Sequence, residues 1–261
     1  MARNSIDITS LALANEKETS ELLFNINAGL VEGVTQERKY GINDNLDTGQ
    51  AELIRDGGGV VAAYPYLTTN AEMYLVSDNA LDTSVVKVWG LLEDVDGNWN
   101  LHDHAIPLNG TTPVSIGTFV RIFRIRPNAS TSPTGSVYAS ERSVGIPTQS
   151  QTHARLTAGK GSTLMAMYTV PSGFTAFIYK LFNSTGKAED ASFSYNIRPF
   201  EKTFRTIGEV GSFQLAIQLE LGFERVDSKS DIAVTAKTLN NNTVGRASFH
   251  FILVPNKYLN I

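Results

Sequence analysis

Two histidines come closest, by type and spacing, to a chemical site. His102 and His104 flank Asp103, so on a strand both imidazoles would lie on the same face. Such a pair binds Zn²⁺ when a third ligand arrives from elsewhere in the chain. The hairpin-turn dipeptide at Asp96 and Gly97 lies close by and favours a simpler interpretation, the polar outer face of a strand. We therefore predict no metal site here.

Residues 93–100 read EDVDGNWN and look like a calcium-binding loop. An EF-hand loop that began at Asp94 would need glycine at position 99 and glutamate at position 105, where this chain has Trp99 and Ala105. A hairpin turn explains the run better. Carboxylates that cluster in a turn also do not provide the two-sided cleft that a glycosidase needs.

No other pattern indicates an active site. The glycines at 57–59 are not followed by a helical pattern, so they cannot form a phosphate-binding loop. The chain has no Gly-x-Ser-x-Gly or His-Glu-x-x-His motif. It has no cysteine, which excludes disulfides, thiol catalysis and cysteine-bound zinc. We predict no catalytic residue, no cofactor and no metal, and a protein that is not an enzyme.

Charge and hydropathy argue against two classes of partner, with a nucleic-acid role for a short arginine-bearing strand as the less favoured alternative. The net charge is −4, with no basic block, which argues against a nucleic-acid-binding surface. Arg121, Arg124 and Arg126 lie within six positions, and we interpret them as an exposed strand face. No signal peptide and no run of 18 apolar residues is present, so we expect no membrane association.

The elements that carry these residues are predicted to be strands. From residue 57 onward the chain alternates with a period of two; for example, Val86 and Val88 should face one side of a strand, and Lys87 and Trp89 the other. Strand-length runs recur every 8 to 12 residues with turn signals between them. The predicted fold is all-β, with one or two jelly-roll-like antiparallel β-sandwiches preceded by an extended N-terminal arm.

The domain boundaries follow from composition. We predict an extended arm over residues 1–55, with a short helix or polar turn in 11–23 and a strand near 20–26, then sandwiches over 56–145 and 146–261. The arm has too few apolar residues to fold alone, so it should lie on the body or on a neighbouring subunit. The side chains predicted to anchor contacts between subunits are Ile6, Ile8, Leu11, Leu22, Phe24 and Ile26.

Several motifs resemble a known group of proteins. They are DNALD at 78–82 before the strand VKVWG, LNGTTPV at 108–114, MYTVPSGFTA at 167–176, IRPF at 197–200 and the closing FHFILV at 249–254. With these motifs the chain resembles uncharacterised structural proteins of marine and freshwater tailed bacteriophages. The resemblance implies a virion component, such as a head-decoration, neck or tail-associated protein, made in the cytoplasm of a bacterial host. The implied partners are copies of itself and other virion proteins (major capsid, portal or neck, tail).

Three functions are open from the sequence. The first is an assembly protein without turnover, expected to form a trimer or hexamer through its arm and sheet edges. The second is a receptor- or glycan-binding sandwich at the tail, in which Trp89, Trp99, Tyr64 and Tyr66 would stack on sugar rings. The third is a hydrolase of host glycans that uses Asp94 or Asp96.

Overall fold

The computed structural model describes residues 16–60, 64–128, 132–186, 190–213 and 216–259, and these are mostly strand. Its helices are α2 (Glu16–Asn27) and two short 3₁₀ turns, η2 (Gln149–Gln151) and η3 (Asn256–Tyr258). None of the described helices is long and apolar enough to cross a bilayer. The strands are β1 (Thr35–Leu46), β2 (Glu52–Leu53), β3 (Ala71–Ser77), β4 (Val85–Glu93), β5 (Trp99–Pro107), β6 (Val114–Phe119), β7 (Arg121–Pro127), β8 (Val137–Ser140), β9 (Thr152–Leu156), β10 (Met167–Thr169), β11 (Phe174–Thr185), β12 (Asp190–Arg198), β13 (Arg205–Phe213), β14 (Ile217–Val226), β15 (Asp231–Thr238) and β16 (Thr243–Pro255).

Two sheets form a jelly roll. One has the strand order β1-β16-β11-β14 and the other β10-β15-β12-β13, with the short β2 added beside β15. If the eight strands other than β2 are numbered in chain order, the two sheets read 1-8-3-6 and 2-7-4-5, which is the double Greek key of a jelly roll. The predicted all-β, jelly-roll-like class is therefore confirmed.

Alternation along the strands fills the jelly-roll core. Phe249 and Phe251 of β16 and Phe193 and Tyr195 of β12 are fully or almost fully buried in one hydrophobic cluster. Tyr195 can be buried because its hydroxyl donates a hydrogen bond to the carbonyl of Phe182 across the sandwich, at 2.8 Å.

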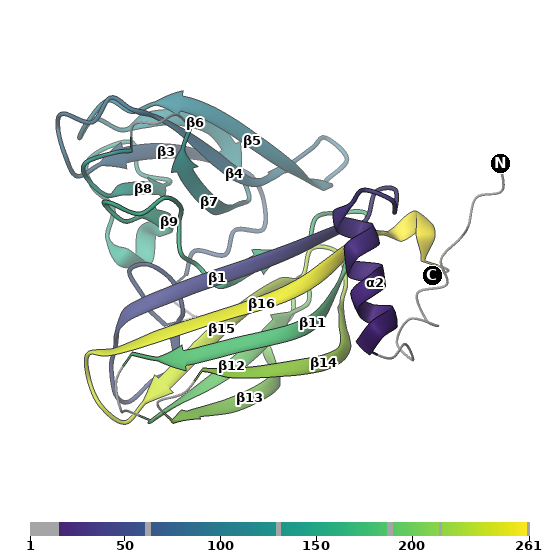
Figure 1. Ribbon diagram of the computed structural model, residues 1–261. Coiled ribbons are helices and arrows are strands. Elements are labelled where there is room, and N and C mark those ends of the chain that lie inside the picture. Colours follow the sequence, from purple (N-terminus) through teal and green to yellow (C-terminus); the bar gives the residue numbers. More distant parts are fainter. Residues whose placement is uncertain (1–15, 61–63, 129–131, 187–189, 214–215, 260–261) are drawn as a thin grey trace.

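A second sandwich is inserted between β2 and β10. Its sheets have the orders β6-β3-β8-β9 and β5-β4-β7, and it lies above the jelly roll in Figure 1. The alternation predicted for β4 is confirmed, because Val86 and Val88 are fully buried while Lys87 and Trp89 are partly exposed on the other face.

The predicted arm is wrong for its described part. Residues 16–27 form a helix, which agrees with the short helix offered for 11–23 but not with the strand near 20–26, and β1 pairs with β16 along nearly its whole length. β1 escaped the alternation test because the buried face of its middle carries Lys39, Gly41 and Asn43 instead of apolar side chains. Without apolar residues at alternate positions, the sequence of this edge strand predicts a polar, irregular segment instead of a strand.

The predicted boundary at 145/146 also differs from the structure. It falls between β8 and β9, which pair in one sheet with Val137 opposite Leu156. The polar stretch at 143–151 is a loop within the inserted sandwich, and loops and domain linkers share the same composition. The jelly roll takes residues from β1 and β2 as well as those from β10 onward.

Helix α2 covers one end of the outer face of the β1-β16-β11-β14 sheet. Ile26 is buried against Tyr179, Ile252 and Val254, and Leu22 packs on the same cluster. This contact anchors the residues before β1 to the jelly roll (Figure 1).

Gly41 gives a direct test of the close packing of β1. A Cβ at this position would lie 2.1 Å from the carbonyl oxygen of Ile54 and 2.3 Å from the amide nitrogen of Ala166, both backbone atoms. We expect Gly41→Ala to lower the free energy of unfolding by about 3 kcal/mol, measured by urea denaturation, because backbone cannot move aside cheaply. Gly208→Ala, where nothing lies within 4 Å, should change it by less than about 0.5 kcal/mol. Equal effects of the two substitutions would contradict this packing.

Candidate functional site

The buried ionisable groups meet where the two sandwiches touch. Asp231, at the start of β15, is 3% exposed and lies in register with Thr169 on β10 and Arg198 on β12. Its Oδ1 accepts hydrogen bonds from Thr169 Oγ1 at 2.6 Å and from Arg121 Nε at 3.0 Å. Its Oδ2 accepts from Arg121 Nη2 at 3.3 Å and from Arg198 Nε at 2.9 Å. One carboxylate of the jelly roll thus holds an arginine from each sandwich.

Aromatic rings complete this site, which we call the junction (Tyr66, Trp99, Arg121, Thr169, Arg198 and Asp231). The Cζ of Arg198 lies 4.0 Å from the ring centre of Tyr66, and the Cζ of Arg121 lies 5.3 Å from the same ring. Arg121 also lies 5.2 Å from the Trp99 ring and donates to the carbonyls of Leu67 and Val120. The π faces and carbonyls offset the charge that a single carboxylate leaves on two guanidiniums. Burial raises the pKa of the Tyr66 hydroxyl well above its ordinary value.

Two of the motifs behind the phage resemblance, at 167–176 and 197–200, meet at the junction. Thr169 belongs to the 167–176 motif, and Arg198 belongs to IRPF, whose Phe200 contacts Trp99 edge-on at 5.2 Å between ring centres. Ser172, in the turn of the first motif, receives the Trp99 amide on its Oγ at 2.8 Å and donates its own amide to the Trp99 carbonyl at 2.9 Å. These conspicuous residues therefore join the two sandwiches.

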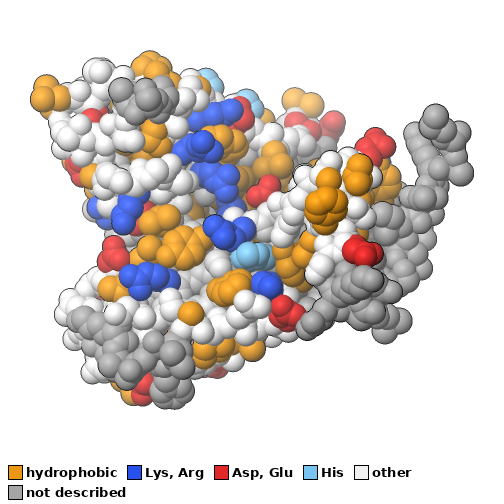
Figure 2. Space-filling model, in the orientation of Figure 1, with side chains coloured by type: hydrophobic (Ala, Val, Ile, Leu, Met, Phe, Trp, Pro, Cys, Tyr) orange, Lys and Arg blue, Asp and Glu red, His pale blue; other side chains and the backbone are white. Residues whose placement is uncertain are grey.

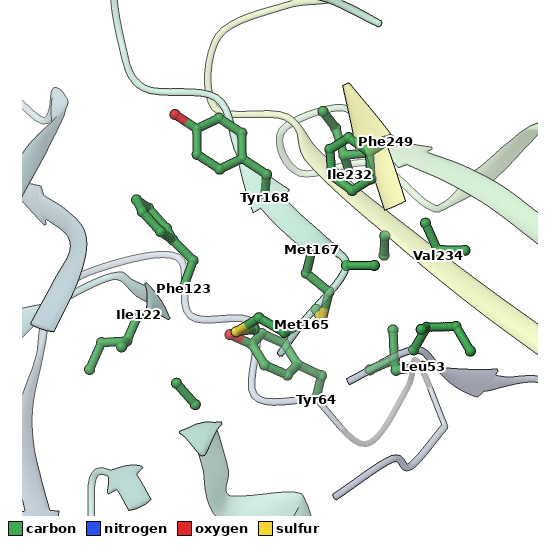
Figure 3. Packing of buried hydrophobic residues seen from close by; sticks show 14 of the residues in the cluster. Leu53, Tyr64, Ile122, Phe123, Met165, Met167, Tyr168, Ile232, Val234 and Phe249 are labelled. Atoms are coloured by element: carbon green, nitrogen blue, oxygen red, sulfur yellow. The ribbon is translucent and has the colours of Figure 1, made fainter. Parts of the chain in front are cut away.

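A buried lysine lies beside this junction. Lys39 of β1 is 4% exposed, and its Nζ lies 4.2 Å from the ring centre of Phe123 and 5.1 Å from that of Tyr168. Figure 3 shows these two rings side by side, one from each sandwich, 5.2 Å between centres. Burial, with a smaller contribution from Arg124, lowers the pKa of Lys39 to about 7. No carboxylate forms an ion pair with it among the described residues.

The space enclosed between these groups is small. A cavity of about 10 Å³ lies between Tyr66, Arg121, Met165, Tyr168 and Asp231. That volume accommodates about one water molecule. The convergent charged and aromatic side chains thus contact one another, and their arrangement suits a structural joint.

The second sandwich is also tied down at its chain ends. Arg55, which follows β2, is 3% exposed and donates to the carbonyls of Gly58, Thr152 and Gln149 at 2.9, 2.8 and 3.2 Å. Its guanidinium stacks 4.9 Å from the Tyr64 ring. One side chain therefore bonds the exit from the jelly roll to the start of β9.

The six residues predicted to anchor contacts between subunits have different environments in the structure. Ile6, Ile8 and Leu11 lie outside the described residues. Leu22 and Ile26 pack on the chain's own sheet, so in this fold they stabilise the subunit itself. Phe24 lies on the opposite side of α2 and is 69% exposed. Their spacing along the helix distinguishes them. Residues 22 and 26 are four positions apart and lie on the same helix face, whereas residue 24 lies on the opposite face.

The predicted glycan-stacking residues are mostly buried. Trp99 is 0% exposed and Tyr64 5% exposed, and the Tyr66 hydroxyl is enclosed. Trp89 and Tyr66 are each partly exposed; the Trp89 ring lies beside Lys87 and Arg126, and the Tyr66 ring beside Arg198.

The histidines and the acidic turn are separate local features. His102 and His104 lie on the edge strand β5, and no group of three or more potential metal ligands occurs in the described part of the chain. The Asp94 carboxylate accepts from the amides of Asp96 and Asn98 at 2.9 and 2.8 Å, which lowers its pKa. This is the hydrogen bonding of a hairpin turn, as the sequence indicated.

The arginine strand is only partly as predicted. Arg124 and Arg126 are partly or fully exposed, but Arg121 is 3% exposed and is central to the junction. A signal was available in the sequence, because Arg121 interrupts the apolar run FVRIF at 119–123. A charge inside such a run is buried only when it is paired.

Comparison with known proteins gives no family. No protein-family model and no curated protein matches the chain. Among solved structures it is similar to the infectious bursal disease virus Gx strain (8% identity, TM-score 0.26, 87% of this chain and 73% of that chain). It is also similar to the T13 particle of that virus (10%, 0.27, 87% and 71%). A third match is the CBM22 tandem domain of Xyn10C from Paenibacillus barcinonensis (12%, 0.23, 86% and 93%). Because the TM-scores are this low, we derive no function from these similarities.

The junction predicts a large effect of Arg121. Arg121→Met keeps most of the apolar volume but leaves Asp231 with one arginine, Arg198, so we expect the free energy of unfolding to fall by about 3 kcal/mol. Arg205→Met serves as the matched control, because Arg205 is 57% exposed and pairs with Glu224 at the surface. That change should cost less than about 1 kcal/mol. Chemical denaturation of both variants measures the difference, and similar losses would refute a junction role for Arg121.

Lys39 predicts a rise of stability with pH. Between about pH 7 and 10.5 the unfolded chain holds a proton on Lys39 that the folded chain has released, so the free energy of unfolding rises with pH. The slope from this group approaches about 1.4 kcal/mol per pH unit. The variant Lys39→Met lacks this titrating amino group. Urea denaturation from pH 6.5 to 9 should therefore show that the free energy of unfolding of the wild type rises relative to that of the variant. Parallel curves would show that Lys39 titrates normally.

Proposed function

We propose that this chain is a non-enzymatic structural subunit of a virion. It would act in a tailed phage, as a capsid decoration protein or a neck or tail component, and would assemble with copies of itself and with other virion proteins. The observation that carries the proposal is the jelly roll with a second sandwich joined to it by buried charges. Jelly rolls serve in viral capsids and in lectins, so the fold alone leaves both open.

The use of the buried polar groups supports a structural role over a ligand-binding one. The charged side chains of the junction form hydrogen bonds with one another, and the cavity between them holds about one water molecule. Of the aromatic residues predicted for glycan stacking, Trp99 and Tyr64 are buried in the core. The alternative of a glycan-binding module thereby loses its principal contacts, and Trp89 alone does not make a sugar site.

Exposed apolar side chains on and after α2 supply an assembly surface. Phe24 is 69% and Leu30 70% exposed, although the helix itself is anchored by Ile26. Large apolar groups held in water on a fixed element gain free energy when a neighbouring subunit covers them. The edge strand β5 adds unpaired backbone groups and Leu101, which is 52% exposed.

The double variant Phe24→Asp/Leu30→Asp tests this surface. We expect the wild type to sediment as a trimer or hexamer and the variant as a folded monomer with an unchanged circular dichroism spectrum, because neither residue is buried within the subunit. Leu239→Asp is the matched control, since Leu239 is 73% exposed in the turn before β16. It should leave the oligomer intact. A wild type that stays monomeric at high concentration would contradict assembly through α2.

The virion assignment needs its own test. A cryo-EM map of the purified particle should contain the double sandwich at symmetry-related positions. Mass spectrometry that finds the chain in infected cells but not in purified particles would contradict the assignment.

A further inference from the structure

Unpaired cations gather on the outer face of β4 and β7. Cross-strand register places Arg124 beside Trp89 and Arg126 beside Lys87. The Nζ of Lys87 and the Cζ of Arg126 lie 5.1 and 5.6 Å from the Trp89 ring. Lys87 forms an ion pair with Asp103 at 2.7 Å, whereas Arg124 and Arg126 have no ion pair among the described residues. The Trp89 ring thus lies among three cations, of which only Lys87 has a carboxylate partner in the described part of the chain.

The outer face of the jelly roll continues this pattern. Arg38, His250 and Lys180 are aligned across β1, β16 and β11, so Arg38 and Lys180 are about 10 Å apart at the backbone. Lys180 pairs with Glu220 at 3.2 Å, while Arg38 is exposed and has no ion pair in the described part of the chain.

Aromatic rings follow in the next row of the same face. Tyr40, Ser248 and Phe182 lie across β1, β16 and β11, and Tyr40 is 37% exposed. Arg246, another cation without an ion pair in this part of the chain, lies two residues farther along β16. Cations and aromatic rings therefore alternate along the jelly-roll face as well.

The two groups of cations form one surface. Figure 2 shows Lys and Arg side chains following one another from the upper sandwich, across the junction, to the lower one on the face toward the viewer. Arg124 is close enough to lower the pKa of Lys39, and Arg38 and Lys180, together with the larger effect of burial, lower that of His250 to about 4. Both sandwiches therefore contribute to one region of positive potential.

Six cations placed by the strand register define this surface, which we call the basic face: Arg38, Lys87, Arg124, Arg126, Lys180 and Arg246. Lys87 and Lys180 pair with the carboxylates of Asp103 and Glu220. The four arginines form no ion pair among the described residues.

We propose that the basic face binds single-stranded nucleic acid. Four of its six cations are arginines, whose planar guanidinium binds phosphate in a bidentate manner and stacks on bases. Trp89 and Tyr40, between the cations, provide stacking surfaces of the kind that binds single strands without sequence preference. The proposal departs from the expectation based on a net charge of −4, because composition averages over the surface, while a polyanion meets only one face. The proposal is independent of self-assembly, since every contributing residue lies in one subunit.

Fluorescence anisotropy with a labelled 20-nucleotide oligo-dT tests the proposal on the full chain. We expect binding that weakens steeply with salt. The triple variant Arg38→Gln/Arg124→Gln/Arg126→Gln should weaken binding at least tenfold and lower the slope of log Kd against log salt by about 2, at roughly 0.7 per lost phosphate contact. If the triple variant melts early, the exposed pair Arg38→Gln/Arg126→Gln should still give a reduced slope.

The control removes the same charge elsewhere. Arg142→Gln/Lys202→Gln/Arg205→Gln alters exposed cations outside β1, β4, β7, β11 and β16 and should leave affinity within twofold. Three results would overturn the proposal: no binding of oligo-dT by the wild type, equal loss in the control, or binding of heparin with none of oligo-dT. The last would assign the face to an anionic glycan. The oligomeric state, read by sedimentation on the same samples, keeps this test separate from that of assembly.

Discussion

The contact on which the rest of the structure depends is the buried carboxylate of Asp231 with its two arginines. Removing these charges from water is costly, and the cost is offset only because Arg121 binds in a bidentate manner and Thr169 and Arg198 occupy the remaining acceptor positions. Such geometry tolerates little movement. It therefore fixes how the inserted sandwich lies on the jelly roll, and the basic face, which spans both, exists only in that arrangement.

The insertion explains why such a joint is needed. The chain leaves the jelly roll after β2 and returns at β10, so two strands of one fold are separated by a complete sandwich. Arg55 holds the exit, Lys39 and Tyr168 pack against Phe123 at the side, and Asp231 binds Arg121 at the centre. Apolar side chains of both sandwiches also pack in one buried cluster, in which Figure 3 shows Ile122, Met165 and Tyr64. The polar groups fix the orientation of one sandwich relative to the other, because apolar packing alone would allow the two to slide past each other.

Period-two alternation was enough to predict the all-β class and the faces of β4, because those strands place apolar residues on one side. It failed for β1, whose inward residues are not apolar. Lys39 and Gly41 are explained by contacts with Phe123 and Ala166, far along the chain, and Asn43 by its hydrogen bond to Glu52 of β2. The junction was missed for the same reason. Arg121 and Asp231 are 110 positions apart, and each alone looks like a surface charge. The basic face was hidden as well, since it combines cations from five strands whose register the sequence does not state.

The central claim is that the two sandwiches form one cooperative unit. Differential scanning calorimetry of the full chain tests it most directly. The account predicts a single transition whose calorimetric and van't Hoff enthalpies agree. Two resolved transitions, or a calorimetric enthalpy well above the van't Hoff value, would show that the sandwiches unfold independently and would contradict it.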